Sequence, residues 1–555
     1  MDGSILPCAN VNSPDGPCKE EGRFACKACQ LVQVSHWRTH SKDCKSPMLK
    51  TKWEPGWVLD GHQPAFVGEA PSPMVHFGGL KYLWGNMPAI DMLKLEQNEG
   101  EAFEGRLRLL CAASGDPRNV IKTIASLPDG FKGAIHVTMN DKDTDIVARN
   151  VVILLIALTF SNVDEAVDLM IHVWYSALLT QRHADLLRTK VRPFLKTFND
   201  KIAGKNPKSL QAKTWNFGPR SIRLVFTKEV WGKLLGFVTV SETLTRQEAD
   251  VSRTAITLCP ERRDYRDRQY TCLLPAQRMC QERYRTDGVL LPFGHSREPF
   301  TVPNPTFFQN NHTWPVKDSS DPFGGWDMFD VLDKTPRAAA SDIYGKLYYY
   351  IENLCKRFLA RLRRLPVGFE LFNMETQELP KHVRVSSFAR IEVANMSDMG
   401  YLGYAKTLAY LGPLLQPKIS NPHATLIMLF MNAVRETMTE EDTMADMVNA
   451  FPHVQHFVTR PESQSTYDVG FIRYTFGMDR FRDNDRYFNK YMRAWKFEDG
   501  GRRMGMAIKE KHTIIDKWPL RLRKIAGEEG SREEFDMSLG TGHAGDERYM
   551  EWKFA

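Results

Sequence analysis

The stretch that most constrains the fold of this chain alternates two short apolar runs with two runs of helical spacing. Residues 106–113 (RLRLLCAA) and 133–139 (GAIHVTM) predict buried strands, whereas residues 120–127 and 145–160 show the apolar spacing of helices. Strand, turn, helix, strand and helix in this order are typical of one half of a doubly wound α/β domain. The sequence therefore predicts a Rossmann-like α/β fold for this part of the chain.

A later part of the chain has the same α/β character. Residues 367–373, 388–393 and 424–430 predict strands, and residues 401–415 predict a helix. The order of these elements resembles the later strands of class I S-adenosylmethionine methyltransferases. Between the two parts, residues 206–345 are rich in Arg, Tyr, Pro and Gly and give no clear pattern. The sequence leaves open whether the two α/β parts share one sheet or form two domains.

The N-terminal block carries cysteine and histidine at the spacing of a zinc site. Cys26 and Cys29 form a C-x2-C pair, and His40 and Cys44 follow as an H-x3-C pair. Tetrahedral Zn²⁺ takes four such donors, and closely spaced pairs close short loops that cost little chain entropy. We therefore expect zinc as the cofactor of this block, in a structural role.

Two further cysteines precede this set and allow a different arrangement. Cys8 and Cys18 are further candidate zinc ligands, in addition to the set of four. Alternatively, Cys8, Cys18, Cys26 and Cys29 share one metal, which leaves the later histidine and cysteine without one. Both arrangements stay open on spacing alone.

The block resembles the MYND finger family through these ligands and the QVSHW stretch, which contains Gln33 and Trp37. The resemblance implies two interleaved zinc sites, with the two later pairs as the complete second site and Cys8 and Cys18 as half of the first. It also implies that Gln33 and Trp37 line a groove that binds a short, often proline-containing peptide of a partner protein. The chain departs from the family between Cys29 and Gln33, where an aromatic-Cys-x3-Cys stretch is missing. A true loss and a gene-model error would look the same.

Three further stretches resemble a domain of unknown function that is common in fungal MYND-finger proteins. They are residues 83–91 (LWGNMPAID), 114–119 (SGDPRN) and 148–150 (ARN). A related domain opens the dynein axonemal assembly factor three family, and the similarity extends over residues 76–310. This resemblance implies assembly or adaptor work without a settled biochemical activity.

The turn after the first predicted strand is the place for a nucleotide or S-adenosylmethionine pocket. Such a pocket needs glycines where the backbone approaches the ligand, and an acid after the second strand to bind ribose. Gly115, Asp116 and Asp141 are the candidates, but the turn has one glycine and continues with Pro117. The alternative is that Gly115 and Asp116 form a turn and helix cap, and that the segment Asp141 to Asp145 caps the next helix.

A second pocket candidate follows the later strands. Asn373 and Glu375 come after one predicted strand, and Asn395 and Asp398 come after the next. Polar residues at the carboxyl ends of parallel strands are the usual place for a ligand in α/β folds. Turn chemistry explains the same residues without a ligand.

Composition and motifs exclude several classes of protein. The net charge of +7 comes from 74 basic and 67 acidic residues spread over the chain, which disfavours nucleic acid or a membrane as the main partner. Scattered cysteines outside the finger favour a reducing compartment, and the apolar run 151–160 is too short to cross a bilayer. We expect the cytoplasm, with the nucleus as the alternative. The sequence lacks a Gly-x-Ser-x-Gly elbow, a Walker loop and a His-Glu-x-x-His motif.

The length of 555 residues is too great for one core. The expected division is a zinc finger at 1–46, a linker at 47–75, a Rossmann-like domain at 76–205, a mixed region at 206–345, a second α/β part at 346–500, and a loose, charged tail at 501–555.

Two hypotheses about function follow. The first is a non-catalytic adaptor or assembly factor whose finger captures a partner peptide while the α/β body serves as a scaffold. The second is a divergent S-adenosylmethionine-dependent methyltransferase with the finger as substrate selector. A corepressor-type role through the finger is a third, weaker hypothesis, and the sequence leaves the partner and the oligomeric state open.

Overall fold

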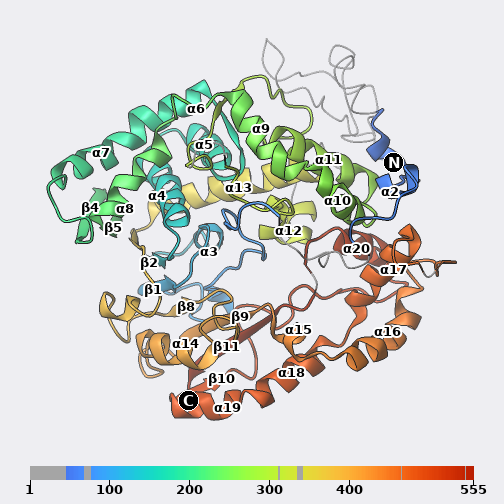
Figure 1. Cartoon of the computed structure of the whole chain (residues 1–555). Helices are drawn as coiled ribbons and strands as arrows, with labels where there is room; N and C mark the ends of the chain where they lie inside the picture. The colour runs from blue at the N-terminus through green and yellow to red at the C-terminus, as the bar shows by residue number, and fades with distance from the viewer. Residues whose placement is uncertain (1–44, 68–76, 310–312, 334–341, 464, 544) are drawn as a thin grey trace.

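The computed structural model describes residues 45–67, 77–309, 313–333, 342–463, 465–543 and 545–555 (Figure 1). The predicted zinc ligands, together with Gln33 and Trp37, lie outside the described residues. The described part of the chain is an α/β protein built around one large mixed sheet with helices packed against it.

The large sheet has nine strands in the order β10-β11-β9-β8-β1-β2-β7-β5-β4 within the described residues. The six strands from β9 to β5 run parallel, whereas β4, β11 and β10 pair antiparallel with their neighbours β5, β9 and β11. A separate antiparallel pair joins β3 to β6. The strands are β1 Arg106–Cys111, β2 Ala134–Asn140, β3 Leu178–Thr180, β4 Leu210–Phe217, β5 Arg220–Thr227, β6 Phe300–Pro303, β7 Val367–Phe372, β8 Arg390–Glu392, β9 Thr425–Phe430, β10 Met506–Ile508 and β11 Arg548–Phe554.

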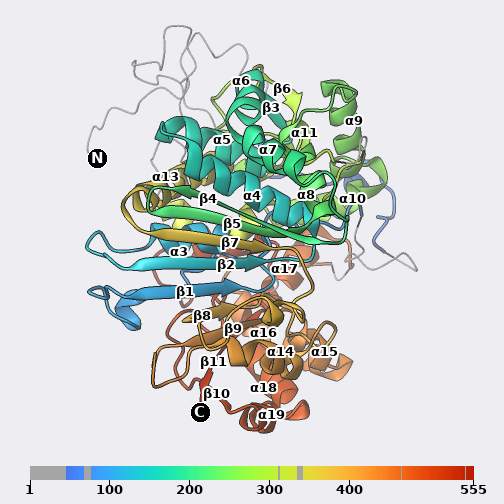
Figure 2. The ribbon, with the colours of Figure 1, turned by 90° about the vertical axis from the view of Figure 1, so that its left-hand side faces the viewer.

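Helices cover both faces of this sheet. Figure 2 shows the strands side by side from β4 to β10, with helices of residues 163–201 beyond the β4 end and helices of residues 484–503 near β10. The earlier helices are α2 Gly56–Leu59, α3 Arg118–Ala125, α4 Thr144–Thr159, α5 Val163–Tyr175, α6 Gln181–Leu186, α7 Arg192–Lys201, α8 Lys228–Leu234, α9 Arg246–Thr257, α10 Arg263–Tyr270, α11 Pro275–Asp287, α12 Met328–Asp333 and α13 Ile343–Arg364. The later helices are α14 Tyr404–Leu411, α15 Ala433–Thr437, α16 Glu440–Val454, α17 Val469–Met478, α18 Asn484–Ala494, α19 Phe497–Arg503 and α20 Ser531–Leu539.

The alternation of side chains along β1 divides the core into two layers. Leu107, Leu109 and Cys111 point into the cluster that also holds α3, α4, α5 and α13. Leu110 and Ala112 point into the opposite cluster, which holds α14, α18 and α19. All five side chains are buried, so β1 is covered on both faces, as expected for a central strand of a parallel sheet.

The elements that apolar patterning predicted most strongly are present. The strands predicted near residues 106–113, 133–139 and 424–430 are β1, β2 and β9, and the long helix predicted at 145–160 is α4. The two predicted α/β parts share one sheet, because β1 pairs in parallel with β8 over Leu109–Cys111. The α/β class is therefore confirmed.

Two regions differ from the expectation. The mixed region 206–345 supplies the β4–β5 hairpin to the same sheet, and Gly218, with a φ of 64°, allows its tight turn. The expected loose tail instead supplies β10 and β11, and β11 is inserted between β9 and β10. Trp552 on β11 is fully buried, so this part of the chain completes the core.

Candidate functional site

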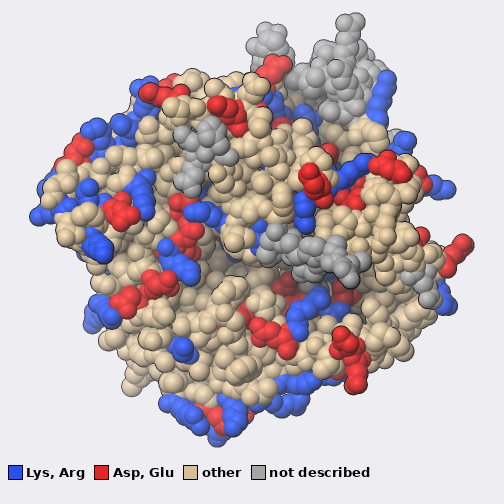
Figure 3. Space-filling view, in the orientation of Figure 1, with Lys and Arg blue, Asp and Glu red and all other residues tan. Residues whose placement is uncertain are grey.

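The carboxyl ends of the parallel strands form one edge of the sheet, called the carboxyl edge below. The chain passes from β1 through α3 to β2 on one side and from β8 through α14 to β9 on the other. In open α/β sheets, ligands usually bind in the crevice between two neighbouring strands whose following connections run to opposite sides. Helices α8 and α15, which follow β5 and β9, both lie at this edge in Figure 2, and Figure 3 shows the same face hollowed near its centre.

The structure brings Gly115 and Asp141 together at this edge, as the pocket hypothesis requires. However, the two residues bond to each other: the Gly115 amide donates to Oδ2 of Asp141 over 3.0 Å. Oδ1 of Asp141 accepts from the amide of Asp143 over 2.9 Å, and the side chain of Asn150 donates to the Gly115 carbonyl over 2.7 Å. Burial raises the pKa of Asp141. The groups expected to bind a ligand are thus bonded within the protein.

The neighbouring strand ends are bonded to each other in the same way. The Asn140 side chain donates to the carbonyls of Ala112 and Met374, each over 3.0 Å. The Asn373 side chain donates to the carbonyls of Asp141 and Lys142 over 2.9 and 3.0 Å. Asn373, a residue of the second pocket candidate, therefore joins the ends of β7 and β2.

Asp116 faces away from Asp141 and forms a buried polar cluster. Its Oδ2 accepts from the Gly85 amide and from Nε1 of Trp174, each over 3.1 Å, and its Oδ1 pairs with Arg118. Nε of Arg118 donates to the carbonyl of Met87 over 3.0 Å. We call Gly85, Met87, Asp116, Arg118 and Trp174 the Asp116 cluster. It ties the loop that precedes β1 to the start of α3 and to the end of α5.

The charges of the Asp116 cluster compensate each other. Burial would lower the pKa of Arg118, but the carboxylate of Asp116 outweighs this effect and raises it. The side chains of Arg118 and Asp116 are 13% and 3% exposed, so their pairing takes place away from solvent. The arrangement is that of a structural ion pair, in which Nε of Arg118 is also bonded to the Met87 carbonyl.

Sequence reasoning missed Arg149 and Trp174. Arg149 is 2% exposed and donates from Nη2 to the Trp174 carbonyl over 2.7 Å and from Nη1 to Oγ1 of Thr306 over 2.5 Å. Burial lowers the pKa of Arg149 to about 10. The available signal was a charged residue inside the apolar run of α4, which in a buried helix requires a partner.

Two carboxyl groups at the carboxyl edge have strongly raised pKa values. Burial raises the pKa of Glu392, at the end of β8, and of Asp398, in the following loop, to about 7 in each case. Glu392 accepts from the Ala394 amide over 2.7 Å, and Asp398 accepts from the Met431 amide over 3.0 Å. Perturbed carboxyls in a crevice are frequent at functional sites, but Glu392 already accepts within its own turn, and Asp398 already joins its loop to the chain after β9.

The raised pKa of Glu392 predicts a pH-dependent cost. A carboxyl whose pKa is higher in the folded state lowers stability as pH rises from its unfolded value toward its folded one. As pH rises from 5 to 8, the free energy of unfolding of the variant Glu392→Gln is therefore expected to rise by about 1–3 kcal/mol relative to that of the wild type. Urea unfolding across this range measures the difference. Glu298→Gln, at an exposed site, is the matched control, and parallel curves for Glu392→Gln and wild type would refute the expectation.

The metal and membrane expectations concern different parts of the chain. The predicted zinc ligands lie outside the described residues, so the structure leaves that prediction untested. Within the described ranges, no group of three or more His, Cys, Asp and Glu side chains is arranged to hold a metal ion. Among the same residues, no helix combines the length and apolarity needed to span a bilayer.

Comparison with known proteins identifies one stretch of the chain. Residues 83–179 match a family described as a domain of unknown function (DUF4470). Over 75 residues the chain is 33% identical to dynein axonemal assembly factor 3 of Danio rerio, which covers 14% of this chain and 15% of that protein. No solved structure matches the chain. The link to the domain family and to the assembly factor is thus supported over a limited stretch.

The matched stretch contains the whole Asp116 cluster. Gly85 and Met87 lie near its beginning and Trp174 near its end, so the cluster joins the two ends of the matched region. β1, α3, β2, α4 and α5 lie between them. In this chain, the domain's buried polar contacts hold its own elements together.

Proposed function

We propose that this protein is a non-catalytic adaptor or assembly factor. The observation that carries the proposal is the carboxyl edge, where the groups expected to bind a ligand are bonded to each other. The Gly115 amide donates to Oδ2 of Asp141 over 3.0 Å. The side chains of Asn140 and Asn373 donate to backbone carbonyls at the neighbouring strand ends. The relative named dynein axonemal assembly factor 3 gives independent support for assembly work.

In this proposal, the N-terminal finger supplies the contact with the partner. Cys26, Cys29, His40 and Cys44 hold zinc, and Gln33 and Trp37 contact a peptide of a partner protein in the cytoplasm. The α/β body holds the finger and offers a second surface. The support for the finger is the C-x2-C and H-x3-C spacing in the sequence.

Loss of one zinc ligand tests the finger directly. The variant Cys26→Ala is expected to lose bound zinc and partner capture while the thermal unfolding of the body stays unchanged, because metal binding and finger folding are coupled. Elemental analysis of the purified full chain measures zinc, and quantitative mass spectrometry measures the proteins that co-purify. His36→Ala, outside the predicted ligand set, is the control. Partner capture that survives Cys26→Ala would show that the finger is not the binding element.

A second candidate function is favoured by the strand order. The run β7-β2-β1-β8-β9-β11-β10, with β11 antiparallel between β9 and β10, resembles the sheet of class I S-adenosylmethionine-dependent methyltransferases. In such a protein the turn after β1, with Gly115 and Asp116, and the acid after β2, Asp141, would contact the cofactor. The bonds within the carboxyl edge weigh against this candidate.

Calorimetric titration of the full-length protein with S-adenosylmethionine separates the two candidates. We expect no heat of binding and no thermal stabilisation at millimolar ligand, because a ligand that binds only the folded state would raise stability by mass action. Micromolar binding that Asp141→Ala abolishes would replace the adaptor proposal with the methyltransferase one. Glu378→Ala, which removes an exposed carboxylate that pairs with Lys381, is the control variant.

A further inference from the structure

A cleft lined by arginines lies between the middle and the late parts of the chain. It spans about 680 Å³, including space open to solvent, where α10 faces α17 and the loop after residue 316. In Figure 1, α10 lies above α17 at the same side of the molecule. The residues that line it include Arg262, Arg266, Arg268, Arg285, Asp318 and Phe476. We call it the arginine cleft.

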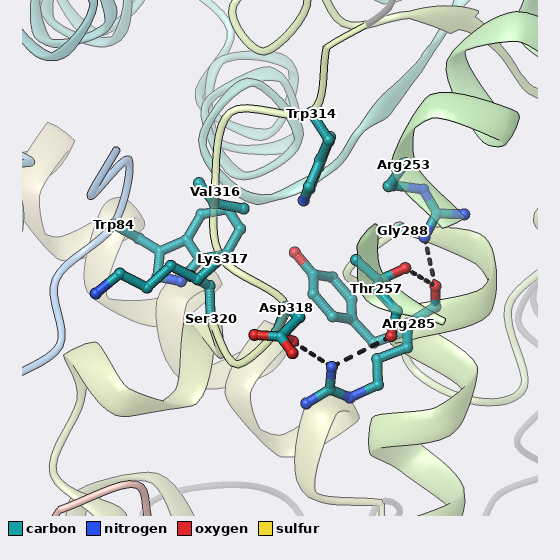
Figure 4. A pocket seen from close by; sticks show the side chains of 11 residues that line it. Trp84, Arg253, Thr257, Arg285, Gly288, Trp314, Val316, Lys317, Asp318 and Ser320 are labelled. Atoms are coloured by element: carbon teal, nitrogen blue, oxygen red, sulfur yellow. Dashed lines mark hydrogen bonds between the residues drawn. The ribbon is translucent and has the colours of Figure 1, made fainter. Parts of the chain in front are cut away.

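One wall of the arginine cleft is held by an internal network around Asp318. Nη1 of Arg285 donates to the carbonyls of Asp318 and, over 3.5 Å, of Thr257, as Figure 4 shows. Nε of Arg262 donates to Oδ2 of Asp318 over 2.8 Å. Asp318 is the one acidic residue among those lining the cleft, and its charge is already engaged by Arg262.

The other wall presents arginines that are held in place but weakly bonded. The guanidinium of Arg268 lies 5.3 Å from the ring centre of Phe66 and 5.2 Å from that of Phe476. Its Nε is buried and has no hydrogen-bond partner within the described residues. Arg266 makes one long hydrogen bond, 3.4 Å from Nη1 to the Cys259 carbonyl. A buried donor without a partner costs free energy, so the site favours a ligand that accepts from it.

The stacking of Arg268 determines which chemistry can satisfy it. Its Cζ lies over the rings of Phe66 and Phe476, and a guanidinium presents its N–H groups within its own plane. Planar forks of this kind bind the oxygens of phosphate or carboxylate, and several arginines around one space favour a doubly charged anion. Oδ1 of Asp318 is also buried without a partner among the described residues, and it can accept from a ligand hydroxyl. A phosphate group that keeps one proton or is attached to a hydroxyl-bearing molecule meets both requirements.

We propose that the arginine cleft binds a phosphate group, with Arg266 and Arg268 as its ligands. The same chemistry occurs in inorganic phosphate, in a nucleoside monophosphate and in phosphoserine. None of the residues that line the cleft belongs to the carboxyl edge or to the predicted finger, so this site is independent of the adaptor proposal.

Isothermal titration calorimetry on the full-length protein tests the site. Inorganic phosphate, adenosine 5′-monophosphate and O-phosphoserine are titrated separately, and the tightest of the three identifies the source of the phosphate. We expect saturable binding of one equivalent, weakened about tenfold or more by Arg268→Gln because a charge-assisted hydrogen bond is lost. Arg266→Gln, at a half-buried position, is expected to weaken binding in the same way.

The control is Arg502→Gln, whose side chain is 74% exposed and pairs with Asp499 on α19. This variant is expected to bind as the wild type does. Thermal unfolding measures whether each variant is folded. If Arg268→Gln does not fold, the phosphate affinity of Arg266→Gln tests the proposal. The proposal is overturned if none of the three compounds binds saturably at millimolar concentration, or if both cleft variants bind with wild-type affinity.

Discussion

Replacement of Asp116 by alanine is expected to lower the free energy of unfolding by about 3–5 kcal/mol. The change leaves the buried guanidinium of Arg118 without its partner and removes the acceptor of Trp174 Nε1 and of the Gly85 amide. Breaking a buried ion pair from one side is costly because the remaining charge stays desolvated. Urea unfolding of the full-length protein, followed by tryptophan fluorescence, measures the loss.

The matched control is Asp129→Ala, since Asp129 also pairs with an arginine, Arg361, but its side chain is 89% exposed. That change is expected to alter stability by less than about 1 kcal/mol. A ligand-binding aspartate would give the opposite pattern, because its removal would spare stability and abolish binding. An Asp116→Ala protein as stable as the wild type would therefore return Asp116 to the list of ligand-binding candidates.

Breaking the ion pair between Glu99 and Arg390 is expected to lower the free energy of unfolding by a similar amount. Arg390 lies on β8 and donates from Nη2 and Nη1 to the two oxygens of Glu99 over 2.7 and 2.8 Å. The two side chains are 0% and 3% exposed. The variant Glu99→Gln is expected to lose about 3–5 kcal/mol of unfolding free energy, whereas the double change Glu99→Leu with Arg390→Met should recover most of it.

The same pair predicts how stability depends on pH. Burial alone would raise the pKa of Glu99, but Arg390 and Asn421 outweigh burial and lower it. A carboxyl whose pKa is lowered by folding contributes stability above its unfolded pKa, and this contribution is lost as pH falls through the folded pKa. The wild type should therefore lose more stability than Glu99→Gln on acidification below about pH 4.5. Equal losses in the two proteins would show that the pair is not ionised in the folded state.

The central elements could be predicted from the sequence because their apolar patterns are continuous. The run around β1 and the long run of α4 lack interior charges apart from Arg106, Arg108 and Arg149. A buried parallel strand reads as an unbroken apolar run, and the strand–helix alternation sets the fold class. Register, strand order and the union of the two α/β parts depend on contacts between residues far apart, which local patterns do not encode.

The C-terminal strand could not be predicted because its buried residues include charged ones. Glu551 on β11 is fully buried, and its carboxylate accepts from the amides of Thr513, Ile514 and Ile515 and from Nζ of Lys509. Charged side chains are seldom buried unless they are paired, so composition alone indicates a solvent-exposed tail.

The candidate site was predicted in part. The proximity of Gly115 and Asp141 follows from the order of strands and turns in an α/β half. In the structure, the Gly115 amide nitrogen lies 3.0 Å from Oδ2 of Asp141. The direction of Asp116 could not be inferred, because its partner Trp174 lies 58 residues away along the chain. The alternative interpretation as turn and cap agrees only in part. Asp143 caps α4, as expected for the segment 141–145. Asp116 does not cap α3 and instead accepts from Gly85 and Trp174.

The position of β11 has a consequence for biosynthesis. Residues 548–554 are translated after both β9 and β10, yet they separate these two strands inside the sheet. Until β11 has been synthesised, the nascent chain leaves the edge of β9 unpaired and the pocket of Trp552 unfilled, and such edges promote aggregation. The emerging polypeptide should therefore require chaperone protection until β11 leaves the ribosome, and a stop codon placed at Arg548 should yield an insoluble product.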